Sequence, residues 1–180
     1  MEDGCSIVPL GEILDRYGNT MAPEILGRFE PVSESSPAEF LADKAIAMER
    51  RDLSRTYLAF DQSRRTILGF FAVGMKCISI PEDSLLSRSM LRQCNIDSAS
   101  GVAQAFLLGQ LARSRSSPKG FGDVLIDQAV DVIRKAKSLV GCRLLRLDCA
   151  DELVPYYEKH GFRMIRKNSE KDLNQMMIIV

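Results

Sequence analysis

The sequence predicts a mixed α/β fold in which helices flank one central sheet. Two observations carry this prediction. Apolar, strand-like segments alternate along the chain with amphipathic, helix-like segments. In addition, a mostly apolar segment at 105–113 leads through a basic, glycine-bearing loop into an amphipathic helix. A strand that is mostly apolar is typical of a sheet that is covered on both faces.

The first half of the chain predicts one helix and two paired strands. A helix is expected from Ser36 to about Arg51, because a serine cap, a proline at the first helical position and Glu39 form a capping-box pattern. Strands are expected at 56–60 and 66–75, and the short polar segment between them predicts an antiparallel hairpin. The polar, weakly helical segment 81–103 could form a lid over a substrate cleft or a surface excursion, and the second is the default.

The second half predicts strands and helices in alternation. Apolar residues at helical spacing extend the helix after the glycine loop to about Val140. A short helix is expected near 153–159, ending before Gly161. The remaining expected strands are 105–113, 142–149 and a closing hairpin of 162–166 with 175–180.

Composition limits the classes of function. A length of 180 residues, with 46% hydrophobic and 27% charged residues, predicts one globular domain, 1–180. The formal net charge is zero, which gives no overall indication of a nucleic-acid or membrane-surface partner. Residues 110–146 nevertheless hold eight Lys/Arg against three Asp, so the glycine loop lies in a basic part of the chain and suits an anionic ligand.

The termini and the cysteines predict a cytoplasmic protein. The sequence shows no signal-peptide pattern and no apolar run of 18 residues, so neither secretion nor a membrane span is expected. Five scattered cysteines and one histidine lack metal-ligand spacing, so we expect reduced thiols and no bound metal.

The loop at 117–122 predicts a seat for a phosphate group. A helix that follows a glycine loop offers unpaired N–H groups and a partial positive charge at its first turn. Gly120 and Gly122 let the backbone approach a ligand closely. Two familiar phosphate loops do not fit, because Lys119 precedes Gly120 and Leu125 stands where a dinucleotide loop needs a small residue.

A third pattern does fit. The segment Ser117-Pro-Lys-Gly-Phe-Gly122 resembles the [RQ]-x-x-G-x-[GA] loop with which GNAT (Gcn5-related) N-acetyltransferases bind the pyrophosphate of acetyl-CoA. The segment Pro155-Tyr-Tyr-Glu-Lys-His-Gly-Phe162 resembles a late F-Y-x-x-x-G-F segment of that family, with Tyr157 at the position of its frequent catalytic tyrosine. Leu108-Gly-Gln-Leu-Ala112 is similar to a strand of the branch that includes tRNA-acetylating toxins. The resemblance covers about residues 55–180.

The resemblance implies a GNAT acyl-CoA N-acyltransferase fold, in which a mostly antiparallel sheet splays between its fourth and fifth strands, here 105–113 and 142–149. It implies acetyl-CoA as cosubstrate and a primary amine that attacks it directly, with Tyr157 as general acid. Tyr156 is then expected to be the more core-facing tyrosine. The residues implied to hold the coenzyme are Leu111, Ala112 and Arg113 through their backbone, and Lys119, Gly120, Phe121, Gly122, Asp123 and Val124 of the loop and helix start.

Three functions stay open. The first is acetylation of a small-molecule or protein amine by a chain able to form homodimers. The second is a toxin that acetylates aminoacyl-tRNA and is neutralised by an antitoxin; zero net charge and Gln110, where that branch has Arg, count against it. The third is a non-catalytic acyl-CoA-binding protein, favoured by Ser117 in place of Arg or Gln and opposed by Tyr157.

No general base is assigned. Glu82, Asp83 or an ordered water could take the proton of the amine. Asp148 ends a predicted strand near the cleft, but a structural role, such as pairing with Arg146, fits it equally well. His160 is interpreted as a surface residue at a helix end.

Overall fold

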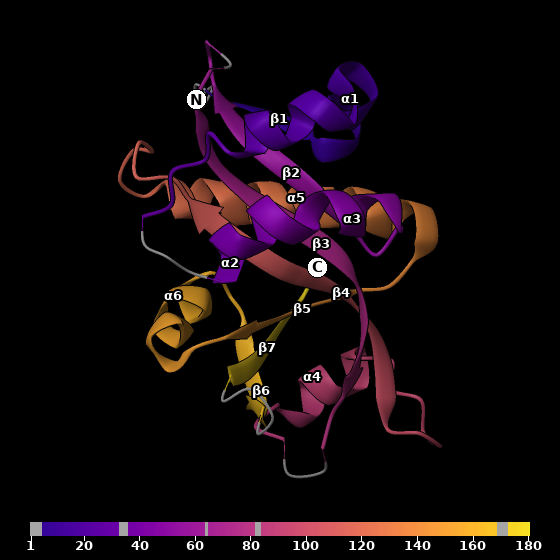
Figure 1. The fold of residues 1–180 in the computed structure, drawn as a ribbon. Coiled ribbons are helices and arrows are strands. Elements are labelled where there is room, and N and C mark those ends of the chain that lie inside the picture. The colour runs from indigo at the N-terminus through magenta and orange to yellow at the C-terminus, as the bar shows by residue number, and fades with distance from the viewer. Residues whose placement is uncertain (1–4, 33–35, 64, 82–83, 169–172) are drawn as a thin grey trace. The chain divides into compact units, whose positions relative to one another are not determined.

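The structure, a computed structural model, describes residues 5–32, 36–63, 65–81, 84–168 and 173–180. Within these residues the strands form one mixed sheet in the order β1-β2-β3-β4-β5-β7-β6, which confirms the predicted α/β class (Figure 1). Contacts within the chain are densest in two compact units, which are described separately below. The expectation of a single domain, 1–180, stays a prediction.

Each unit combines two stretches of the chain. The first consists of Met1–Gly74 and Gln110–Ala129, and the second of Met75–Gly109 and Val130–Val180. Three elements contribute residues to both units: β3 (Ile67–Ser79), β4 (Val102–Arg113) and α5 (Phe121–Val140).

The first unit contains the predicted hairpin and a strand that was not predicted. β2 (Ser54–Asp61) pairs with β3 in antiparallel register, so the expected strands 56–60 and 66–75 are confirmed and extended. β1 (Cys5–Pro9) pairs with the other side of β2. It is followed directly by α1 (Leu10–Leu26), which is interrupted at Gly18 by a backbone φ of 66°. This glycine and Pro23 break the helical apolar period, which is why the sequence did not predict the element.

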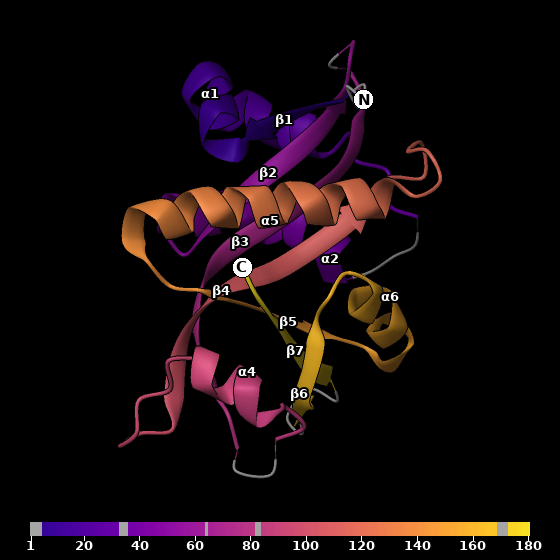
Figure 2. The same ribbon diagram turned by 180° about the vertical axis from the view of Figure 1, so that it is seen from behind.

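Helices cover both faces of this hairpin. The predicted helix from Ser36 is present as α2 (Ser36–Glu39), a π-helical turn η1 (Phe40–Lys44) and α3 (Ala45–Arg50). α1 and α3 pack on one face of β2 and β3, and α5 lies on the other face (Figures 1 and 2). The core on the first face includes the buried side chains Leu10, Ile13, Leu26, Phe40, Leu41, Leu58, Phe60, Phe70 and Ala72.

The second unit contains the strands that close the sheet. β5 (Leu144–Cys149) runs parallel to β4 and antiparallel to β7 (Leu173–Ile179), which also pairs with β6 (Arg163–Asn168). The short helix expected near 153–159 is present as η2 (Asp151–Leu153) and α6 (Val154–Lys159). These elements confirm the predicted order of the second half.

A few described residues of the segment 81–103 reach the core of the second unit. The segment contains α4 (Arg88–Gln93), and its Leu86 and Cys94 are buried in a cluster with Leu144 and Met177. Most other described residues of this segment are exposed or partly exposed, and α4 has no buried residue, so the segment lies at the surface as expected by default, with Leu86 and Cys94 anchoring it to the core. Two of the acids considered as a base, Glu82 and Asp83, lie outside the described residues. Where the chain is described, none of its helices combines the length and apolar character needed to cross a bilayer.

Candidate functional site

The loop between β4 and α5 is anchored to the sheet at its first residue. The N–H of Ser114 donates to the carbonyl of Leu68 on β3, at 2.8 Å. The hydroxyl of Ser117 donates to the carbonyl of Ser114, at 2.6 Å, so this side chain faces inward and closes the turn. Where the resembled motif has Arg or Gln, this chain therefore uses its side chain to stabilise the loop.

Gly120 gives the loop the conformation and the space that an anion seat needs. Its φ is +85°, a conformation that costs other residues about 1–2 kcal/mol. A Cβ built at Gly120 would meet no atom within 4 Å, so the space in front of its backbone is open. The backbone at the start of α5 is therefore accessible at this glycine.

The first turn of α5 offers a limited set of donors. The N–H of Phe121 donates to Pro118 at 3.2 Å and that of Asp123 to Gly120 at 3.0 Å, while the Phe121 side chain is buried. The N–H of Gly122 has no acceptor among the residues that the structure describes. Lys119 is exposed and has no carboxylate partner within the same residues. A positive side chain and the Gly122 amide therefore lie next to the open space at Gly120.

Close packing at Gly69 sets the position of α5 and of the end of β4. A Cβ at Gly69 would come within 2.7 Å of the Leu125 side chain and 2.9 Å of the Ala112 carbonyl oxygen. The backbone of β3 therefore supports both the helix and the strand end at Leu111–Arg113 directly. Glycine within a strand commonly marks such a close approach, so Gly69 is itself a sequence signal for the packing found at this position.

A second support comes from the segment after α1. The backbone carbonyl of Glu30 accepts hydrogen bonds from the Ser114 hydroxyl and from the Arg115 N–H, both at 2.9 Å. Pro31 forms an isolated bridge with Ser114 and accepts from the Arg115 guanidinium at 3.2 Å. No sequence signal predicts these contacts, because the partners lie 84 positions apart. They fix the outer side of the loop within the first unit.

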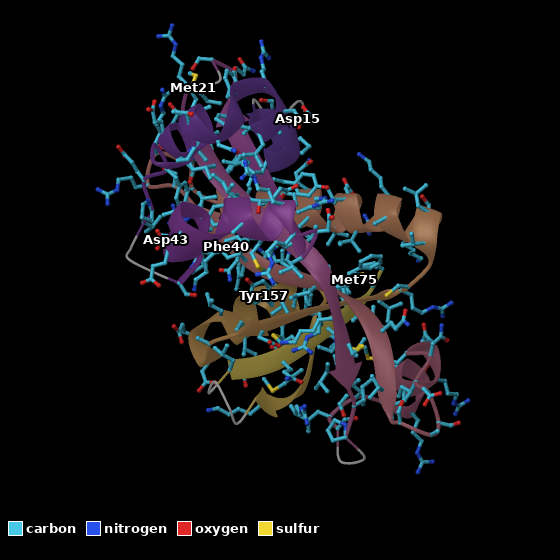
Figure 3. All side chains as sticks on the ribbon, turned by 45° about the vertical axis from the view of Figure 1, so that its right-hand side comes forward. Asp15, Met21, Phe40, Asp43, Met75 and Tyr157 are labelled. Atoms are coloured by element: carbon cyan, nitrogen blue, oxygen red, sulfur yellow. The ribbon has the colours of Figure 1, made fainter. Side chains whose placement is uncertain are left out.

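Tyr157 lies in the second unit, on α6, and is the core-facing member of the tyrosine pair (Figure 3). It is 8% exposed, and its ring packs edge-on against Tyr156 and Phe162, whereas Tyr156 is half-buried. The expectation that Tyr156 faces the core is wrong, because the turn into β6 brings Phe162 against Tyr157. Burial, and secondarily the nearby Cys149, raises the pKa of Tyr157 to about 12. Its hydroxyl is therefore protonated at neutral pH.

Asp148 is engaged by a buried arginine, as the structural interpretation predicted. Its Oδ1 lies 2.6 Å from a guanidinium nitrogen of Arg146, and the same guanidinium donates to the carbonyl of Cys77 at 3.0 Å. Arg146 is 3% exposed. Asp148 is therefore better explained as the counter-ion of this buried arginine. His160 caps the end of α6 and contacts the Tyr156 ring.

Comparisons with known proteins identify the fold. No protein-family model matches the chain, and no curated protein matches it. Among solved structures, AtaT complexed with acetyl-methionyl-tRNAfMet is 21% identical, with a TM-score of 0.74, and the match covers 97% of this chain and 94% of AtaT. AtaTR bound with acetyl-CoA is 20% identical, with a TM-score of 0.67 and coverages of 98% and 94%. A tyrosine-to-phenylalanine mutant of KacT is 16% identical, with a TM-score of 0.72 and coverages of 96% and 94%. The chain therefore has the fold of AtaT and KacT, and the predicted GNAT fold is confirmed.

Proposed function

We propose that this chain is an acetyl-CoA-dependent N-acetyltransferase that transfers an acetyl group to a primary amine. The observation that carries the proposal is the open seat at Gly120, with the amide of Gly122 and the charge of Lys119 beside it. Neighbours with the same fold support it, since AtaT structures include acetyl-CoA. The coenzyme would supply the acyl group as a reactive thioester.

The chain's own residues would bind and orient this group. Amides and Lys119 at the start of α5 would neutralise the pyrophosphate, together with the partial charge of the helix N-terminus. The backbone of Leu111–Arg113 would pair with the pantetheine arm as a short additional strand. Such positioning accounts for much of the rate in a direct transfer, because it replaces an encounter of two free reactants.

Tyr157 would act as the general acid. As the amine nitrogen bonded to the carbonyl carbon, the carbon–sulfur bond would break and the departing thiolate would take the Tyr157 proton. The amine would release its proton to water, and water would return one to Tyr157. The raised pKa of Tyr157, about 12, keeps its hydroxyl protonated at neutral pH and makes it a weaker acid than an exposed tyrosine. Both AtaT and KacT have been solved as tyrosine-to-phenylalanine mutants, which supports a functional tyrosine in this fold.

An aminoacyl-tRNA is the second candidate for the acceptor, with an antitoxin as partner. The observation that favours it is the set of partners seen with a protein of the same fold. AtaT was solved with acetyl-methionyl-tRNAfMet and with the C-terminus of the antitoxin AtaR. The amino group of an aminoacyl ester is a primary amine, so the proposed chemistry is unchanged. Growth arrest on expression, relieved by Tyr157→Phe, would select this acceptor over a small-molecule amine.

Calorimetric titration of acetyl-CoA into the purified chain tests the shared step. We expect binding by the wild type and its loss in Gly120→Glu, because a carboxylate would then occupy the anion seat. Gly141→Glu is the matched control, since Gly141 has a similar φ of +79° and equally open surroundings but follows α5 at its other end. Absence of binding by the wild type, or equal loss in both variants, would contradict the proposed coenzyme seat.

A further inference from the structure

A cavity in the first unit lies between α1 and the strands β1 and β2. Its volume is about 380 Å³, within the range of small-molecule sites in proteins. α1 contributes half of its lining residues, and the others come from β1, from Phe60 of β2, from Arg28 and from the β2–β3 turn. None of them belongs to β4 or to the loop before α5, so the proposed coenzyme seat does not use this cavity.

The floor of the cavity is apolar. Its most buried lining residues are Ile13 of α1 and Phe60 of β2, which are 4% and 8% exposed. Ile25 is partly buried beside them, and Tyr17 and Met21 line the cavity while remaining more exposed (Figure 3 shows Met21 on α1). Covering such side chains removes apolar surface from water, which is favourable. The floor therefore favours an occupant with an apolar body.

The mouth of the cavity is positively charged. Arg16, Arg28 and Arg65 line it and are exposed, and within the described part of the chain none of them has a carboxylate at salt-bridge distance. Glu12 is the acid among the described lining residues, so the arginines exceed the acids by two. The Arg16 guanidinium lies 5.5 Å from the Tyr17 ring centroid, so cationic and apolar surfaces adjoin. The mouth therefore favours an anionic group next to the apolar body.

The volume limits the size of this occupant. An apolar cavity of about 150 Å³ in a protein holds one benzene molecule, so about 380 Å³ gives room for about 15 non-hydrogen atoms. A nucleotide would carry a suitable charge, but its base needs hydrogen-bond partners that side chains such as Ile13 and Phe60 do not offer. A short aliphatic chain needs none. Size, floor and mouth together point to a small amphipathic anion.

We propose that this cavity binds a medium-chain carboxylate of the size of dodecanoate. The carboxylate would accept charge-assisted hydrogen bonds from the guanidinium groups at the mouth, whose paired N–H donors match its two oxygens. The aliphatic chain would lie against Ile13 and Phe60, where it covers the apolar floor. This inference does not depend on acetyl transfer or on the coenzyme seat.

Calorimetric titration of dodecanoate into the purified chain, below the concentration at which micelles form, tests the proposal. Decanoate and octanoate shorten the chain, acetate removes it, and dodecyltrimethylammonium keeps the chain but reverses the charge. We expect dodecanoate to bind, with affinity falling by up to about fourfold for each buried methylene removed. Acetate and dodecyltrimethylammonium should not bind. Absence of dodecanoate binding, or equal binding of dodecyltrimethylammonium, would overturn the proposal.

The variant Arg16→Gln/Arg65→Gln tests the cationic mouth. Its Kd for dodecanoate should be at least about tenfold weaker than that of the wild type, because charge-assisted hydrogen bonds are lost. Lys44→Gln/Arg51→Gln is the matched control, since it removes the same charge at exposed positions of the first unit that do not line the cavity. Circular dichroism would check that both variants are folded. Equal affinities in the two variants would contradict the assigned site.

Methyl NMR of isoleucine-labelled chain locates the bound carboxylate in the wild type itself. Dodecanoate should shift the methyl signals of Ile13 and Ile25, which line the cavity, and leave that of Ile126 unchanged. Ile126 belongs to α5, near the coenzyme seat on the other face of the hairpin. Shifts at Ile126 without shifts at Ile13 and Ile25 would overturn the proposal. So would binding to phosphatidylglycerol vesicles without binding of dodecanoate, which would assign the arginines to a membrane surface instead.

Discussion

Replacement of Gly69 by alanine should both destabilise the first unit and lower its affinity for acetyl-CoA. The added Cβ would lie 2.7 Å from the Leu125 side chain, whereas carbon atoms in contact prefer about 3.5–4.0 Å. Leu125 is fully buried, and the second neighbour is a backbone oxygen of Ala112 at 2.9 Å, so neither can move away freely. Overpacking of this kind costs about 1–3 kcal/mol. In a chain of this length we expect Tm to fall by about 2–12 °C.

The matched control is Gly11→Ala. Gly11 is the second residue of α1, and its added Cβ would meet the Glu49 carboxylate at an ordinary 3.5 Å. Alanine is favoured over glycine in helices by up to about 1 kcal/mol, so Tm should stay constant or rise. Thermal unfolding followed by circular dichroism gives both values, and calorimetry gives acetyl-CoA affinity. Equal Tm values, or a destabilised Gly69→Ala that binds acetyl-CoA like Gly11→Ala, would refute the reasoning that this contact positions the loop.

Three further predictions concern the second unit. Tyr157→Phe should lower kcat by about 10²–10⁴, and Tyr156→Phe should leave it nearly unchanged; equal effects would exclude Tyr157 as the acid. Because burial raises the pKa of Tyr157 from 10 to about 12, its stabilising effect is complete below pH 10 and is lost as the pH rises towards 12. That loss amounts to about 3 kcal/mol of unfolding free energy. The unfolding free energy of Tyr157→Phe, measured with denaturant, should therefore change less with pH in this range than that of the wild type. The same pH dependence in both proteins would contradict the assigned burial. Asp148→Asn should lower the free energy of unfolding by about 3–5 kcal/mol, because it leaves the Arg146 charge buried without its counter-ion. The double variant Arg146→Met/Asp148→Leu should recover much of this loss. If urea unfolding showed no loss of stability in Asp148→Asn, the pairing would be contradicted.

Local patterns in the sequence predicted most of the elements and the chemistry of the loop. Each of these patterns lies within one short stretch of sequence. They are the apolar period of the helix after Gly120, the capping pattern at Ser36 and the apolar strands at 56–60 and 66–75. Glycine spacing at Gly120 and Gly122 predicted the phosphate seat for the same reason. Such features depend on neighbours in sequence, and the structure has the expected helices and strands at these segments. The phosphate seat stays a prediction.

Features that depend on distant neighbours could not be predicted in this way. β1 is too short to carry a clear period, and α1 is interrupted at Gly18, so both were missed although they complete one face of the first unit. Only packing reveals that Phe162 places Tyr157, and not Tyr156, in the core.

The sequence by itself thus determined the α/β class, the order of most elements and the glycine loop before α5, because these follow from local propensity and spacing. The tertiary structure decided how this loop is held and which distant residues surround the cavity under α1. The carbonyls of Glu30 and Pro31 accept from Ser114 and Arg115 across 84 positions, and Arg16, Arg28 and Arg65 line one cavity with residues of β1, α1 and β2. Such contacts exist only when folding brings separate segments together, so no local pattern encodes them.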